Sequence, residues 1–285
     1  NMVNRNNIKD KLLFFLHTTF TISSGDVGAS HYLYDHLKLL QHYSLGNIKE
    51  LAKKITLDNA MLNYLDNTQN NANNPNENYA REFLELFTIT KGEQIGEGDY
   101  STYTEDDVIM AAKVFSGFKT KLDRTIIDPD TGIPMGRISV NQHDQSTKVF
   151  SHAFNNYQLA GGTDENTIMS ELHEFVDMIF DKEATARSYV SKLYRFFVKS
   201  EWTVEDEVTI INPLAQQLIE NNYEIVPVVR TLLSSQHFFD FGDDDPNDEI
   251  IGSIIKSPLQ LAASMIRNFE FIIPEPSEDL GNYYK

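Results

Sequence analysis

The chain has 285 residues, of which 41% are hydrophobic and 11% aromatic, so it can bury a sizeable core and a fully disordered protein is excluded. Lys and Arg total 24 against 42 Asp and Glu, and the formal net charge of -18 disfavours binding to nucleic acid or anionic membranes through phosphate contacts. The absence of cysteine excludes disulfides, thiolate metal sites and cysteine nucleophiles. No apolar run approaches the roughly 18 residues of a transmembrane helix, and the N-terminus lacks the apolar segment of a signal peptide. An export signal would therefore lie outside this sequence.

Helical spacing of apolar residues dominates the start of the chain. It predicts a first helix that carries Ile8, Leu12, Phe15 and Leu16. A second helix is expected over residues 30–43, and a third follows it from residue 48 to about residue 55.

The tract NTQNNANNPNEN at residues 67–78 is polar and rich in asparagine, which predicts a surface loop that adds nothing to the core. It leads into the segment NPNENYAREFLELFT. Asn74 suits an N-cap, Pro75 a first helical position and Glu77 a capping box, so we expect a helix to begin there. The buried side of that helix is predicted to carry Ala80, Phe83, Leu84 and Phe87.

The middle of the chain mixes helix and hairpin signals. Thr104 and Asp107 form a capping pair ahead of another helix. Between residues 119 and 140, apolar residues flank the turn sequence DPDTG, which predicts a β-hairpin that interrupts the helices.

The last part of the chain returns to helical spacing. Helices are expected from Asp164, over residues 184–198, around Leu214, around Val228 and after Pro258, with an acidic loop at residues 240–249. Together these elements predict a mainly α fold, a multi-helix orthogonal bundle with one small β-hairpin insertion. We expect one helical domain over residues 1–285, made of N-terminal helices (1–118), the hairpin with a His-Asp segment (119–150) and C-terminal helices (151–285).

The polar side of the NPNENYARE helix is the first candidate site. Glu77, Arg81 and Glu85 lie at i, i+4 and i+8, so the arginine can pair with a carboxylate one turn away on either side. Spacing alone favours an exposed ladder of ion pairs. The alternative is a cleft in which Arg81 holds an anionic ligand or orients a glutamate that acts as general base.

Histidines supply the second set of candidates. His143 and Asp144 could ligate a divalent metal or provide acid-base chemistry, but neighbours on an extended chain point to opposite faces, so a structural role for Asp144 at the turn stays open. His17, among apolar residues of the first helix, is more often a packing residue than a ligand. No HExxH, GxSxG, phosphate-binding loop or dinucleotide motif occurs. The acidic loop has alternating oxygen ligands but lacks the glycine and the glutamate of a calcium loop, so a solvated turn is favoured there.

Several stretches together resemble one large bacterial family, domain of unknown function 1800. The segments AMLNYLDNTQN, NPNENYAREFLELFT and YTEDDVIMAAKVFSGF are similar to its central signature, and HDQSTKVF to its histidine-aspartate segment. Its early helix and its later helices resemble KLLFFLHTTF, SKLYRFFV, VVRTLLSSQHF and IIKSPLQLAASMIR. The resemblance covers nearly the whole chain.

The resemblance implies a predominantly helical protein of the bacterial envelope or exterior, often encoded beside a sulfatase-like or phosphatase-like family, with no established activity. The residues that match its polar signature are Asn76, Glu77, Arg81, Glu82, Glu85, His143, Asp144 and His17. The chain departs from the family at Ser146, where glycine is usual, and at Ser151 and His152, which replace leucine-glycine. Some terminal segments of the family have no counterpart, which implies a fragment of a longer chain.

Two functions follow as hypotheses. The leading one is an exported accessory or assembly component, secreted or in the cell envelope, whose acidic surface and Glu77, Arg81, Glu85 face bind a protein partner or an extracellular glycan. The resemblance points to a sulfatase-like or phosphatase-like envelope protein as that partner. The alternative is a metal-assisted hydrolase that uses carboxylates of the NENYARE helix with His143 and Asp144.

Overall fold

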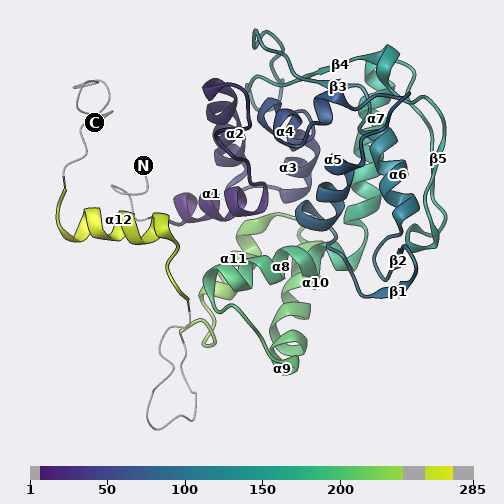
Figure 1. Ribbon diagram of the computed structural model, residues 1–285. Coiled ribbons are helices and arrows are strands. Elements are labelled where there is room, and N and C mark those ends of the chain that lie inside the picture. Colours follow the sequence, from purple (N-terminus) through teal and green to yellow (C-terminus); the bar gives the residue numbers. More distant parts are fainter. Residues whose placement is uncertain (1–6, 240–253, 272–285) are drawn as a thin grey trace.

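Four helices open the part of the chain that the computed structural model describes, residues 7–239 and 254–271. They are α1 (Ile8–Thr19), α2 (Ser30–Tyr43), α3 (Ile48–Ile55) and α4 (Asn59–Tyr64). Asn7, Asn47 and Asp58 cap α1, α3 and α4 by accepting a backbone N–H, which satisfies a donor that has no partner inside the helix. α1 packs on α2, and α2 on α3 and α4 (Figure 1).

The asparagine-rich tract is more than a surface loop, and our expectation that it adds nothing to the core was wrong. It contains the short 3₁₀ helix η1 (Asn67–Gln69), and the side chains of Asn67 and Asn70 are fully buried. Asn70 Nδ2 donates to the carbonyl of Ala112 over 2.8 Å, and Asn67 Nδ2 donates to the carbonyl of Phe115 over 3.2 Å. These amides are tolerated inside because backbone carbonyls at the end of another helix accept their hydrogen bonds.

The next helix, α5 (Glu77–Glu82), begins later than predicted and continues as a π-helix, η2 (Phe83–Phe87). Its N-cap is Asn76, whose side chain accepts from the N–H of Asn78, and not Asn74. Asn74 instead donates its N–H to the side chain of Asn71 in a turn of the tract, which holds Pro75 outside the helix. The predicted buried side is confirmed, since Ala80, Phe83, Leu84 and Phe87 are at most 2% exposed.

An aromatic cluster joins α5 and η2 to α6 (Glu105–Val114) and α7 (Glu165–Phe180). Phe115 packs edge-on against Tyr79 with ring centroids 4.8 Å apart and against Phe175 at 5.3 Å, and Phe83 contacts both Phe115 and Phe175. Rings of this size supply much of the apolar area buried in a core. The cluster therefore fixes the inner side of α5 while its polar side faces outward.

Within residues 7–239 and 254–271, three small antiparallel sheets interrupt the helices, where we expected one hairpin. The expected hairpin exists, with β3 (Phe118–Lys119) paired to β4 (Arg137–Ile138) and a turn at DPDTG in which Asp128 N–H donates to Ile133 O. The others pair β1 (Gln94–Gly96) with β2 (Asp99–Tyr100), and β5 (Lys148–Val149) with β6 (Gln158–Leu159). Short 3₁₀ helices η3 (Val140–Gln142) and η4 (His152–Phe154) lie beside β4 and β5. The mainly α fold is confirmed.

The C-terminal helices follow the predicted order. They are α8 (Glu183–Phe197), α9 (Val204–Asp206), the π-helix η5 (Glu207–Ile211), α10 (Asn212–Glu220), α11 (Ile225–Leu233) and α12 (Pro258–Asn268). α8 packs on α1, α10 and α11, while α12 lies at the edge of the molecule near α1 (Figure 1). The predicted acidic loop and its calcium-like residues lie outside the described residues. Within the described ranges, no helix combines the length and the apolar character needed to cross a bilayer.

A backbone seam connects the beginning of α3 to the loop before α11. Ile48 N–H donates to Tyr223 O over 3.0 Å, and Ile225 N–H donates to Gly46 O over 3.2 Å. Asn47 Nδ2 also donates to Asn222 O over 2.7 Å. These bonds join segments about 175 positions apart in the sequence.

Candidate functional site

Arg81 is the centre of the predicted polar face, but its main partner comes from another element. Its two terminal nitrogens lie 3.0 and 2.7 Å from the two carboxylate oxygens of Glu105, the first residue of α6. Glu77 and Glu85, the partners expected from spacing, lie farther from Arg81, at 3.4 and 3.7 Å. The hydrogen bond from Arg81 lowers the pKa of Glu105, and Glu105 in turn raises the pKa of Arg81. The two-pronged contact ties α5 to the start of α6.

Glu85 is held by side chains beyond its own helix. Tyr103 donates its hydroxyl to Glu85, and Lys91 Nζ lies 3.5 Å from the same carboxylate oxygen. Burial, followed by this hydrogen bond, raises the pKa of Tyr103. The Glu85 carboxylate is thus enclosed by a phenol and two cations, which leaves it poorly placed to act as a base.

Glu82 differs from its neighbours because no hydrogen bond or ion pair joins its carboxylate to the described residues. Burial and then the charge of Glu85 raise its pKa, while Arg81 opposes them. The side chain is half-buried. Among the carboxylates predicted for this face, Glu82 is the one left available for an outside partner.

Asn76 has a structural task at the base of this face. Its side chain caps α5, its own N–H donates to Asn70 Oδ1 over 3.0 Å, and its Nδ2 donates to Asp66 O over 3.3 Å. All of these bonds fix the chain at the entry to α5.

His143 belongs to a separate, buried network. Its Nδ1 lies 2.8 Å from the carbonyl oxygen of Ser116, and its Nε2 lies 2.9 Å from Glu171 Oε2. Lys148 Nζ lies 2.6 Å from the other oxygen of Glu171, and Gly162 N–H donates to Glu171 Oε2 over 2.6 Å. The His143, Lys148 and Glu171 side chains are at most 1% exposed. Both ring nitrogens are engaged, so His143 presents neither of them to a substrate.

Asp144 holds the turn that follows His143. Its carboxylate accepts from the N–H of Ser146 over 2.9 Å and from that residue's hydroxyl, and its carbonyl accepts from Lys148. Burial tends to raise the pKa of Asp144, but the hydrogen bonds from Ser146 and the charges of Lys148 and Lys113 leave it lowered. The structural role left open by the sequence accounts for these contacts.

His17 packs on a second buried histidine. Its ring lies edge-on to His36 with centroids 6.0 Å apart, and its Nδ1 is buried without a hydrogen bond to any described residue. His36 is held between Asp58 Oδ2 at 2.8 Å and Phe20 O at 3.1 Å. Burial and the nearby His36 lower the pKa of His17. These contacts are those of a packing residue.

The predicted residues do not converge on one point. The Arg81 cluster meets α6 at Glu105, whereas His143 and Asp144 bond to Ser116 just beyond the other end of α6. The ten residues of α6 lie between these contacts, a length of about 15 Å at 1.5 Å per residue. In the described parts of the chain, no three His, Asp or Glu side chains are grouped as metal ligands.

Four residues that complete these clusters were missed from the sequence. Glu105 and Tyr103 close the polar face, and Glu171 and Lys148 complete the buried network. The acidic start of the YTEDD segment was a usable signal for Glu105. No comparable signal marked Glu171 in the sequence, because a glutamate on a long amphipathic helix ordinarily faces solvent.

The fold is mainly α. Ion pairs connect its helices, and the polar side of α5 and η2 is partly exposed. The chain belongs to the family described as "Protein of unknown function (DUF1800)", which matches residues 1–283. Neither a curated protein nor a solved structure matches it.

Proposed function

We propose that this protein is an exported bacterial accessory or assembly component that binds a protein partner through the outer face of α5 and η2. One observation carries the proposal. Arg81 of that face is paired with Glu105 and Glu77, yet the side chains of Arg81, Glu105 and Glu77 remain 32%, 37% and 47% exposed. A rigid, charged and partly open face fixed to an aromatic core suits recognition.

The net negative charge of this face determines the kind of partner surface that it would bind. Glu77, Glu82 and Glu105 outnumber Arg81 on it, so a complementary surface would present lysine or arginine. The family resemblance supports a secreted or envelope location and a sulfatase-like or phosphatase-like envelope protein as that partner.

The hydrolase alternative receives no comparable support. Such an enzyme would need carboxylates of α5 beside His143 and Asp144. Arg81 of α5 bonds to Glu105 at the start of α6, whereas Asp144 bonds to Ser116 just beyond the end of α6. His143 is enclosed by Ser116 and Glu171, so no observation favours that reaction.

The test is affinity capture from the protein's own source, without chelators, followed by native mass spectrometry. The test variant is Glu77→Gln with Glu82→Gln, which keeps the Arg81–Glu105 contact. Glu205→Gln with Glu220→Gln is the matched control, because both residues are exposed on α9 and α10 and the charge change is the same. We expect a partner chain with the wild type and the control, and its loss with the test variant.

Equal recovery of the partner with both double variants would remove this face from the interaction. A stoichiometric metal with no partner chain would revive the hydrolase. Retention on an extracellular polysaccharide, lost in the test variant, would make the partner a glycan.

A further inference from the structure

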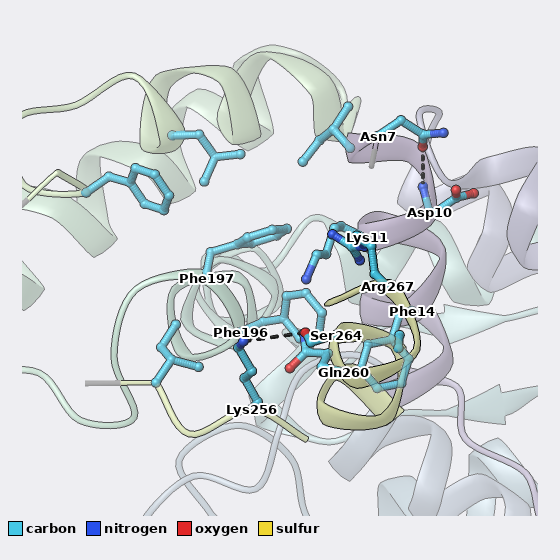
Figure 2. A pocket seen from close by; sticks show the side chains of 15 residues that line it. Asn7, Asp10, Lys11, Phe14, Phe196, Phe197, Lys256, Gln260, Ser264 and Arg267 are labelled. Atoms are coloured by element: carbon cyan, nitrogen blue, oxygen red, sulfur yellow. Dashed lines mark hydrogen bonds between the residues drawn. The ribbon is translucent and has the colours of Figure 1, made fainter. Parts of the chain in front are cut away.

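A cavity of about 570 Å³ lies between α1, α8 and α12 (Figure 2). No residue of α5 lines it. Its apolar wall is largely aromatic, with Phe14, Phe196, Phe197 and Phe238. Phe196 packs edge-on against Phe14 and Phe197, with ring centroids 5.8 and 4.9 Å apart. The volume is within the range of about 300–1,000 Å³ that is typical of pockets for small ligands.

Three cations line the same cavity. They are Lys11 on α1, Lys256 just before α12 and Arg267 near the end of α12 (Figure 2). No carboxylate among residues 7–239 and 254–271 pairs with any of them. Lys256 Nζ donates a long hydrogen bond of 3.4 Å to the hydroxyl of Ser264. In a chain with a formal net charge of -18, it is unusual for a cavity to be lined by three cations that have no carboxylate partner in the described residues.

One carboxylate opposes them. Asp10 also lines the cavity, and one of its oxygens is buried without a hydrogen bond to a described residue. Asp10 occupies the first turn of α1, where the helix N-terminus already favours a negative charge. The cavity as a whole therefore still favours an anion.

We infer that this cavity binds a single-chain anionic amphiphile, such as a long-chain carboxylate. The phenylalanine rings would contact the apolar chain, and Lys11 and Arg267 would contact the anionic head. Gln260 and Ser264 on the inner side of α12 offer hydrogen bonds to the same head group. Three cations and one carboxylate line the cavity, so an amphiphile with a negative head group binds more tightly than one with the same apolar chain and a positive head group.

The experiment is isothermal titration of the full chain with dodecanoate, below its micelle concentration and at low ionic strength. Dodecyltrimethylammonium is the matched probe, since it has the same tail and the opposite charge. We expect binding of dodecanoate, weakened by added salt, and binding of the cation that is at least about tenfold weaker.

Variants locate the site. Lys11→Gln with Arg267→Gln should weaken dodecanoate binding by about tenfold or more, because two charged contacts are lost. Lys9→Gln with Arg230→Gln removes one lysine and one arginine from exposed positions outside the cavity, and should leave the affinity unchanged. Ser264→Trp should block the cavity, while circular dichroism reports whether each variant is folded.

Three results would overturn the inference. They are equal affinity for the two amphiphiles, unchanged affinity in the Lys11 and Arg267 double variant, and a preference for an acidic peptide that alternates aspartate and phenylalanine. The last result would instead make the cavity a peptide site.

Discussion

Glu171 is the residue on which the buried polar contacts of the middle region converge. Its carboxylate contacts the side chains of His143 and Lys148 and accepts a hydrogen bond from the N–H of Gly162. One carboxylate thus connects α7 to two loops. A buried charge is tolerated only when such partners replace the water that it has lost.

We predict that Glu171→Ala lowers the free energy of unfolding by about 3–5 kcal/mol, because it removes the carboxylate that pairs with the buried Lys148 ammonium and leaves the buried N–H of Gly162 without a partner. Among the described residues, Lys148 then keeps only its contact with Asp144. Urea denaturation followed by circular dichroism measures the change. Glu174→Ala, one turn farther along α7, removes only an exposed hydrogen bond from Tyr157 and should cost about 0.5 kcal/mol. Similar losses in the two variants would contradict the role given to Glu171.

Arg81→Ala should cost far less. Solvent screens a pair in which Arg81 is 32% and Glu105 37% exposed, so we expect a loss of about 1 kcal/mol for the bidentate contact. A double-mutant cycle with Glu105→Gln measures the coupling, and Glu77→Gln is the control. A coupling energy near zero would show that the contact does not stabilise the α5–α6 connection.

Lys192 offers a test by pH. Its ammonium donates to the carbonyl of Leu86 in η2, and burial lowers its pKa to about 8. The unfolded chain, with an ordinary lysine pKa of about 10.4, then binds more protons between about pH 8 and 10.4. The contribution of Lys192 to stability therefore rises with pH across that window.

Competitive acetylation from pH 7 to 11, read by peptide mass spectrometry, should give a reactivity midpoint for Lys192 near pH 8. In parallel, Lys192→Met should be more stable than the wild type at pH 7, and this advantage should shrink by pH 9.5. A midpoint near the ordinary lysine value would contradict the prediction.

At the scale of single residues, the sequence predicted which polar residues lie near one another along the chain. The spacing of Glu77, Arg81 and Glu85 showed the i, i+4 neighbours, but the closer partner Glu105 lies 24 positions away. Such a partner depends on how α5 packs on α6, which local spacing does not determine.

At the scale of elements, apolar periodicity was reliable and local caps were not. The helix expected over residues 30–43 is α2 (Ser30–Tyr43), residue for residue. The start of α5 moved from Asn74 to Asn76 because the buried Asn70 accepts the N–H of Asn76, a tertiary contact that overrides a local capping pattern. Two of the sheets were missed because strands of two or three residues show no periodicity. The equally short pair of β3 and β4 was predicted only because apolar residues flank the turn sequence DPDTG.

Gly117 links α6 to β3 in a conformation that L-residues rarely adopt, with φ at +80°. A Cβ there would lie 2.8 Å from Ser139 O and 2.9 Å from His143 N. We predict that Gly117→Ala destabilises the protein by about 2 kcal/mol or more, from both strain and crowding.

Gly132 is the matched control, since its φ is +70° but nothing lies within 4 Å of the corresponding Cβ. Gly132→Ala should cost about 1 kcal/mol, from backbone strain alone. Thermal unfolding of both variants measures the difference, and equal costs would show that the contacts with Ser139 and His143 relax freely.

At the scale of the whole molecule, the excess of 42 acidic over 24 basic residues creates self-repulsion at neutral pH. Added salt screens that repulsion. We predict that the melting temperature at pH 7 rises between 10 and 200 mM NaCl, as measured by scanning calorimetry, with sucrose of equal osmolality as the non-ionic control. A falling or constant melting temperature in NaCl would show that the attractive pairs, such as Arg81 with Glu105, outweigh the repulsion.

The seam between residues 46–48 and 222–225 has a consequence for how the chain is made. During synthesis the start of α3 leaves the ribosome long before Tyr223 and Ile225. The hydrogen bonds that the N–H of Ile48 and the carbonyl of Gly46 make with these residues therefore cannot form until then. Until then, the N–H of Ile48 and the carbonyl of Gly46 lack these hydrogen bonds. A truncated chain that ends before residue 222 would never form them. Residue 225 must have left the ribosome before the N-terminal helices reach their final hydrogen bonding.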